Sequence, residues 1–200
     1  VFHLAAMAGL LQSWSAFDAY LSCNVLATQR LLDAARQARP GHLVHVSTSS
    51  VYGLDSTGAE DRPREPMSPY GVTKLAAEHL VFAYARNFDL PVTVLRYFSI
   101  YGPRQRPDMG YTAMAHGPTG DVFNVGGGDV ISAIDALRLI ESITGRAADV
   151  VFGPSRPGEQ REALADTSKA RRVLGWSPRV GIEAGLRRQV AWQAAAQAAA

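Results

Sequence analysis

The chain has 200 residues, of which 47% are hydrophobic and 19% charged, a make-up typical of a soluble globular protein with a sizeable core. Its formal net charge of +2 is too small to indicate nucleic acid or an anionic membrane as the main partner, and no apolar run approaches the roughly 20 residues that span a bilayer. Its one cysteine, Cys23, excludes an internal disulfide and fits a reducing cytoplasm, and we expect its side chain to be a small buried hydrophobe.

Short apolar runs alternate with helical patterns along the chain. The first run, residues 1–6, ends in small residues, which is typical of a buried strand whose carboxyl end meets a ligand or a tight turn. From Ser15 to Arg36, apolar or small residues recur at helical spacing, until Pro40 and Gly41 stop the helix. The same patterns predict further strands over 42–47, 92–97, 121–125 and 150–152, further helices over 68–87, 168–174 and 182–193, a helix capped by Ser132, and an Ala-rich tail over 193–200.

This order of elements predicts an α/β protein with a parallel sheet. Parallel strands need a crossover connection, which is usually a helix, and the alternating patterns supply one. Ligands of such sheets bind at the carboxyl ends of the strands. Residues that follow the predicted strands are therefore the first candidates for a binding site.

Tyr70 and Lys74 are four residues apart in the helix predicted over 68–87, so their side chains share one face. An ordinary tyrosine has a pKa of about 10 and cannot act as a base at neutral pH, but a neighbouring ammonium favours its phenolate. The pair can therefore form a general base. This spacing alone is a weak signal, because it arises by chance in many chains.

Hydroxyl side chains gather between Val46 and Gly53, at the end of the strand that precedes this helix. A turn capped by serine and threonine would produce the same cluster. Beside the tyrosine and lysine, a hydroxyl from this strand end can also hydrogen-bond the substrate oxygen that Tyr70 deprotonates. The two features together point to proton and hydride transfer.

With these residues the sequence resembles the extended short-chain dehydrogenases that act on nucleotide sugars, the NAD-dependent epimerase/dehydratase family, and is most similar to their UDP-glucuronate 4-epimerases. The matching stretches run in family order along nearly the whole chain, and together they are highly specific. They are residues 2–6, 24–28, 46–53, 68–74, 95–104, 123–126, 156–159 and 165–166.

The resemblance implies a Rossmann-type, doubly wound parallel sheet in an NAD-binding domain over residues 1–110. A smaller nucleotide-sugar-binding lobe would cover most of 111–192, and a tail 193–200. Family members begin with a strand, a Gly-rich turn and a helix that hold the NAD pyrophosphate, and none of these precedes Val1. They also carry a further segment between Met109 and Gly120. We therefore expect the working enzyme to be longer than this chain.

By the same resemblance, three residues carry the chemistry. Tyr70 would be the base for the C4 hydroxyl of the sugar, Lys74 would bind the nicotinamide ribose and lower the pKa of Tyr70, and Thr48 would assist the proton transfer. The C4 hydride would pass to NAD and return to the other face of a transient 4-keto sugar, so that C4 inverts with no net redox change. The positions that match the cofactor side are Leu4, Ala5, Ala6, Asn24, Ser47, Tyr70, Lys74 and Tyr97.

The residues that follow Thr48 help to choose the reaction. Related 4,6-dehydratases and decarboxylases carry acidic residues in the next two positions, where this chain has Ser49 and Ser50. Because no acid is in place, elimination is not expected. Thr48 and Ser49 would instead contact the substrate of an epimerase.

Ser99 stands where hexose 4-epimerases usually carry asparagine and UDP-glucuronate 4-epimerases a hydroxyl residue. We therefore expect Ser49, Ser99 and Arg106 to hold a sugar carboxylate, although Arg106 could also be a solvated surface residue. A 4-keto uronic acid is a β-keto acid, so a firmly held carboxylate would protect it from losing carbon dioxide. Arg156 and Glu159 match positions that hold the diphosphate and the uridine ribose.

The nearest alternative is a UDP-glucose or UDP-N-acetylglucosamine 4-epimerase, and the next is a non-catalytic nucleotide-sugar-binding protein. The family often dimerises, so a cytoplasmic homodimer with a UDP-sugar substrate is expected, with neither nucleic acid nor membrane as a partner. The five histidines lack the spacing of metal ligands, and no metal site is predicted.

Overall fold

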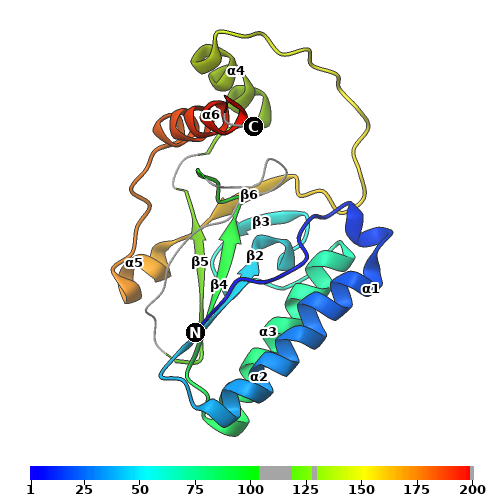
Figure 1. Ribbon diagram of the computed structural model, residues 1–200, viewed down its shortest axis with the longest axis vertical. Helices are drawn as coiled ribbons and strands as arrows, with labels where there is room; N and C mark the ends of the chain where they lie inside the picture. The colour runs from blue at the N-terminus through cyan, green and yellow to red at the C-terminus, as the bar shows by residue number, and fades with distance from the viewer. Residues whose placement is uncertain (104–118, 128–129, 199–200) are drawn as a thin grey trace.

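The protein is built on a four-stranded parallel sheet of order β1-β2-β4-β5 (Figure 1), in a computed structural model that describes residues 1–103, 119–127 and 130–198. Its strands are β1 (Phe2–His3), β2 (Leu43–Thr48), β4 (Val92–Phe98) and β5 (Asp121–Gly126). Every residue of β2 and β4 is buried, as expected for parallel strands covered on both faces. The predicted α/β class is confirmed.

Helices cover both faces of this sheet (Figure 1). One face carries α1 (Phe17–Tyr20), a π-helical turn over Leu21–Leu26, α2 (Ala27–Ala38) and α3 (Pro69–Phe88). Leu32, Val81 and Val94 belong to the apolar cluster on that side. The other face carries α5 (Ser168–Leu174), whose Ala170 packs with Phe123. This arrangement is the doubly wound sheet that the resemblance implied.

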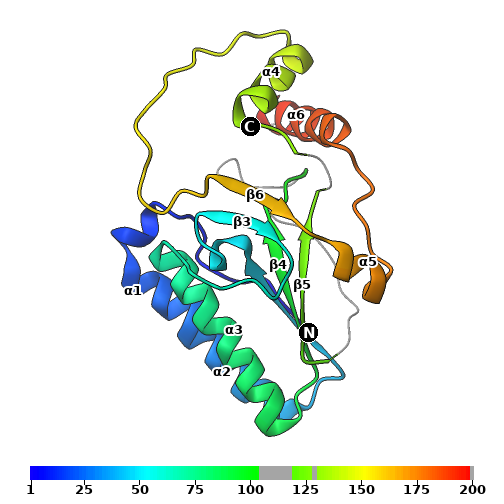
Figure 2. The same cartoon turned by 180° about the vertical axis from the view of Figure 1, so that it is seen from behind.

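A smaller group of elements lies beyond the carboxyl ends of the strands (Figure 2). It contains a two-stranded parallel pair, β3 (Asp55–Gly58) with β6 (Glu162–Ala165), and the helices α4 (Ala133–Thr144) and α6 (Ile182–Ala198). Ser132 caps α4 as predicted, because its hydroxyl accepts a hydrogen bond from the backbone N–H of Asp135 at 3.0 Å. Tyr101, in the loop after β4, donates to the carbonyl of Ile182 at 3.1 Å, which ties the start of α6 to the sheet.

Some expectations were wrong. Residues 150–152 form no strand, because they lie in the long connection from α4 to β6, where Val151 and Phe152 are 86% and 85% exposed. The first strand is two residues long instead of six, and the β3–β6 pair was not predicted because both strands are short and rich in small or polar residues. Cys23 is exposed, since it lies on the outer side of the π-helical turn. Within the part of the chain that the structure describes, no helix has the length and apolar character to cross a membrane.

Candidate active site

The first two turns of α3 place the predicted tyrosine and lysine beside the carboxyl end of β2. Ser68 caps the helix by accepting a hydrogen bond from the N–H of Gly71 at 3.1 Å, and Pro69 occupies the first helical position. Tyr70 and Lys74 then share the buried face, and each is 4% exposed. The ammonium of Lys74 donates to the carbonyl of Val46 in β2 at 2.6 Å, which joins the helix to the strand that ends in Thr48.

Gly71 allows this helix to approach the strand end closely. A Cβ at this position would lie 2.7 Å from the carbonyl oxygen of Ser50 and 2.9 Å from the Cβ of Pro66, both too close for a real side chain. The glycine between the two predicted catalytic residues therefore sets the distance between α3 and the hydroxyl cluster. Sequence spacing alone gave no sign of this role.

The hydroxyl cluster lies where β2 ends. Thr48 is the last residue of the strand, and its hydroxyl oxygen accepts a hydrogen bond from the N–H of Ser50 at 3.2 Å. The same hydroxyl donates to the Ser50 hydroxyl, also at 3.2 Å. The hydroxyl of Ser47 is buried and has no hydrogen-bond partner among the described residues. Such a buried group is costly unless a water or a ligand satisfies it.

The environment of Lys74 makes it a mild acid. Burial lowers the pKa of Lys74 to about 8, while the charge of Glu78, one turn along α3, acts in the opposite direction. At neutral pH most of the population therefore keeps the ammonium. A positive charge one turn away favours the phenolate of Tyr70, which is what a tyrosine base requires.

Two neighbouring histidines, with ring planes inclined at 46°, lie close enough to Lys74 for its charge to act on them. The rings of His3 and His45 are 5.2 Å apart, and His3 shares a hydrogen bond of 2.9 Å with the hydroxyl of Thr28. His45 is 1% exposed, and neither of its ring nitrogens has a partner among the described residues. Burial, and then the charge of Lys74, lowers the pKa of His3 to about 4 and holds the pKa of His45 well below its ordinary value. Both rings are neutral at pH 7.

These histidines should make the fold sensitive to acid. Between pH 6.5 and about 4 the unfolded chain binds protons that the folded His3 does not, so the free energy of unfolding falls as the pH is lowered through this window. We expect His45→Phe to raise stability at pH 7 by about 1–2 kcal/mol, because it removes an unsatisfied buried group, and to flatten the acid dependence. Urea denaturation at pH 7 and pH 5 measures both effects. His79→Gln, at an exposed histidine, is the control. If the free energy of unfolding of His45→Phe changed between pH 7 and pH 5 as much as that of the wild type, the role given to His45 would be wrong.

Four of the predicted cofactor-side residues lie in the loop after β1 or contact it. Leu4, Ala5 and Ala6 are exposed there, and small side chains let a dinucleotide approach the backbone. Asn24 is 1% exposed in the π-helical turn, and its amide binds Met7 through both the N–H at 2.8 Å and the carbonyl at 3.0 Å. π-Helical turns are frequent at functional sites, because the extra residue redirects side chains.

Asn24 also connects this loop to α3, because its amide nitrogen donates to the hydroxyl of Thr73 at 3.1 Å. NAD requires an open approach to the backbone and hydrogen-bonding groups for its ribose and nicotinamide. The exposed loop residues supply the first, and the unpartnered Ser47 hydroxyl and the Lys74 ammonium, with its three donors, supply the second. The described residues therefore fit the predicted cofactor, and contact of Lys74 and Ser47 with its ribose and nicotinamide end stays a prediction.

The sequence pattern did not single out Tyr20, which the structure brings to the same place. Its ring meets the ring of Tyr70 edge-on, with centroids 6.2 Å apart. Its hydroxyl donates to the carbonyls of Ala8 and Gly9, at 2.8 and 2.9 Å. Tyr20 thus fixes both the loop after β1 and the ring of the predicted base. Its apolar position in the helical pattern was the only available signal.

The predicted substrate-side residues come from the strand ends of the sheet and from the turn that precedes β6. Thr48 pairs in register with Tyr97, so Ser49 and Ser99 follow the ends of adjacent strands. Ser49 is buried, whereas Ser99 is exposed with a φ of 45°, a left-handed conformation that turns the chain sharply after β4. Arg106 lies outside the described residues. Its assignment to a carboxylate stays a prediction.

The turn that carries Arg156 and Glu159 reaches the start of α3. A Cβ at Gly158, whose φ is +82°, would lie 2.9 Å from the carbonyl of Met67 and 3.0 Å from the Cβ of Ser68. The carboxylate of Glu159 accepts a hydrogen bond from the N–H of Arg156 at 3.0 Å, which closes the turn. Both predicted nucleotide-binding side chains are exposed beside the helix that holds Tyr70.

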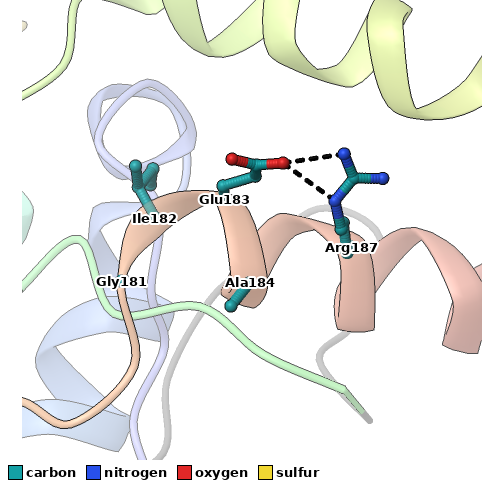
Figure 3. A pocket seen from close by; sticks show the side chains of 5 residues that line it. All are labelled: Gly181, Ile182, Glu183, Ala184 and Arg187. Atoms are coloured by element: carbon teal, nitrogen blue, oxygen red, sulfur yellow. Dashed lines mark hydrogen bonds and ion pairs between the residues drawn. The ribbon is translucent and has the colours of Figure 1, made fainter.

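Tyr97 lies apart from the other cofactor candidates. It is 1% exposed and packs with Val46 and Phe123 on the face that α5 covers, so its contact with a cofactor stays a prediction. A surface pocket of about 490 Å³ at the start of α6 is lined by Gly181, Ile182, Glu183, Ala184 and Arg187, with an ion pair between Glu183 and Arg187 (Figure 3). It contains none of the predicted site residues. The described residues hold no cluster of three potential metal ligands.

Comparison with known proteins shows the family of the chain. Residues 1–126 match the NAD dependent epimerase/dehydratase family. An uncharacterized UDP-glucose epimerase of Bacillus subtilis, YtcB, is 36% identical over 231 residues, which cover 96% of this chain and 73% of that protein.

Solved structures of two proteins have the same fold at similar identity. UDP-glucuronic acid 4-epimerase from Bacillus cereus, in complex with UDP-glucuronic acid and NAD, gives a TM-score of 0.89 at 35% identity over 97% of this chain and 74% of its own. MoeE5, in complex with NAD and either UDP-glucuronic acid or UDP-glucose, gives 0.90 at 37% identity over 98% of this chain and 79% of its own. The chain therefore belongs to the NAD-dependent epimerase/dehydratase family of enzymes.

Proposed function

We propose that the protein inverts C4 of a UDP-sugar and that its preferred reaction interconverts UDP-glucuronate and UDP-galacturonate. The observation that carries the reaction type is the buried pair on α3, where the Lys74 ammonium is bonded to β2 one turn from Tyr70 and beside the strand end that holds Thr48. The B. cereus and MoeE5 structures, both solved with UDP-glucuronic acid and NAD, support the sugar.

In this mechanism Tyr70, as the phenolate, takes the proton of the C4 hydroxyl. The ammonium of Lys74 would stabilise that phenolate and bind ribose hydroxyls. The Thr48 hydroxyl, which donates to the hydroxyl of Ser50 in this structure, would turn its proton to the sugar oxygen when the substrate binds. NAD, when bound, supplies the acceptor and then the donor for the C4 hydride. The 4-keto sugar then rotates within the site so that its other face receives the hydride. Tyr70 returns the proton as the C4 hydroxyl re-forms. No atoms are gained or lost, so the reaction is an isomerisation.

The preference for a uronate depends on the side chains that contact the substituent at C5 of the sugar. Ser49 and Ser99 follow adjacent strand ends, and Arg106 is the predicted partner for the carboxylate. A guanidinium can bind a carboxylate through two parallel hydrogen bonds, which a neutral hydroxymethyl group does not need. Arg156 and Glu159 would bind the diphosphate and the uridine ribose from the turn beside α3.

A substrate profile tests the proposal. We expect the holoenzyme to convert UDP-glucuronate to UDP-galacturonate with a higher kcat/KM than it shows for UDP-glucose or UDP-N-acetylglucosamine, with products identified by NMR. Conversion of UDP-glucose alone would refute the uronate assignment. Absence of turnover with all three sugars would refute the reaction type.

The second candidate is a UDP-glucose 4-epimerase. The name of YtcB favours it, and so does the MoeE5 complex with UDP-glucose, because that site accommodates both sugars. The two candidates share Tyr70, Lys74 and Thr48, and they differ in what the protein presents to the substituent at C5 of the sugar. A non-catalytic binding protein would not need the tyrosine at all.

A further inference from the structure

Gln160 contacts the hydroxyl cluster although it is 111 residues away from Ser49 in the sequence. It lies between Glu159 and β6, and its side chain reaches the loop that follows β2. The amide oxygen accepts a hydrogen bond from the hydroxyl of Ser49 at 3.3 Å. The amide nitrogen donates to the carbonyl of Gly53 at 3.4 Å and to the hydroxyl of Ser56.

Two neighbours fix which way this amide faces. The carbonyl of Gly53 can only accept, so the group beside it must be the amide nitrogen. The hydroxyl of Ser56 donates to the carbonyl of Ser49 at 3.0 Å, so its oxygen is left to accept, again from the nitrogen. The amide oxygen of Gln160 must therefore face Ser49, and the single hydroxyl proton of Ser49 is directed to Gln160.

This geometry decides what Ser49 can offer a ligand. A serine hydroxyl has one proton and two lone pairs, and here the proton is already used. The group can accept a hydrogen bond from a sugar hydroxyl, but it can donate to a carboxylate only after leaving Gln160. Ser49 is therefore suited to a hydroxymethyl group, and a carboxylate must compete for its proton.

We propose that Gln160 is a positioning residue that broadens substrate choice, by turning Ser49 into an acceptor so that the site takes UDP-sugars with a hydroxymethyl group at C5 as well as uronates. This rests on the proposed function, which makes Ser49 a substrate contact. Ser49 is the only one of its hydrogen-bond partners that the proposed function places on the substrate, so the effect of Gln160 should appear in the ratio of two substrates and not in the chemistry at C4.

The test compares kcat/KM of the holoenzyme for UDP-glucuronate and for UDP-glucose. In Gln160→Met, a side chain of similar length whose thioether is only a weak acceptor, we expect the glucuronate-to-glucose ratio to rise about tenfold, as for one hydrogen bond to a charged group. Gln37→Met, at an exposed glutamine of α2, is the matched control and should leave the ratio unchanged. A merely structural role of Gln160 would lower both values together.

Ser49→Ala provides a second test, which does not require Gln160→Met to fold. Ser49→Ala should reduce kcat/KM for UDP-glucose more than for UDP-glucuronate, and adding Gln160→Met to it should change the ratio no further. An unchanged ratio in Gln160→Met, or an equal change with and without Ser49, would overturn the inference while leaving the epimerase intact. Wild-type protein that converts neither sugar would overturn both.

Discussion

A Tyr70→Phe variant should lose epimerase turnover by a factor of about 10² to 10⁴, the usual contribution of a positioned general base. The phenol is 4% exposed, one turn from an ammonium whose pKa of about 8 keeps it charged at neutral pH. Phenylalanine keeps the ring and its edge-on contact with Tyr20 but cannot take the C4 proton. The initial rate of UDP-galacturonate formation measures the loss.

A second tyrosine on the same helix provides the matched control. Tyr84 donates its hydroxyl to Asp33 of α2 at 2.6 Å, near the C-terminal end of α3 and fourteen residues beyond Tyr70. Tyr84→Phe should keep the wild-type turnover, although it loses a hydrogen bond of similar kind. If Tyr70→Phe also kept its turnover, the tyrosine would not be the base, and a non-catalytic binding protein would become the better description.

An Arg96→Met variant should lose about 3–5 kcal/mol of unfolding free energy, the cost of leaving a buried charge without its partner. Arg96 of β4 and Glu78 of α3 form a two-point ion pair, at 3.0 and 2.7 Å, and their side chains are 1% and 2% exposed. Burial alone would lower the pKa of Arg96, but the hydrogen bonds and charge of Glu78 raise it above its ordinary value. Chemical denaturation measures the loss.

The same arginine also donates to the hydroxyl of Tyr52 at 2.7 Å and to the carbonyl of Glu60 at 3.1 Å, so the pair belongs to a larger network. Replacing both charges, as in Arg96→Met with Glu78→Leu, should recover a large part of the stability, because no charge then stays buried alone. Arg187→Met, in an exposed pair with Glu183, should change stability by less than about 1 kcal/mol. A loss in Arg96→Met no larger than in Arg187→Met would contradict the role of the buried pair.

The parts of the site that depend on local spacing were predictable from the sequence. Tyr70 and Lys74 share a helical face because they are four residues apart, and Thr48 ends a strand because the apolar run stops there. The bounds of α3 and β4 differ by one residue from those predicted, since Ser68 and the buried apolar runs mark them clearly. Cofactor residues near β1 follow from the resemblance, and the structure places them together without testing their contacts.

Long-range contacts could not be predicted in the same way. Gln160 meets Ser49 across 111 residues of sequence, and no local pattern encodes that meeting. The close approach of Gly71 to Ser50 is likewise a property of packing, visible only once the helix and the strand lie against each other. Homodimer formation and a cytoplasmic location stay predictions, because a single chain shows neither.

The central claim is that C4 of a UDP-sugar is inverted by removing and returning its own hydrogen. The most direct measurement uses UDP-glucuronate labelled with deuterium at C4, incubated with the holoenzyme in ordinary water and followed by NMR. The proposed mechanism predicts UDP-galacturonate that still carries deuterium at C4. Product with hydrogen from the solvent at C4, or labelled substrate that is not converted, would contradict it.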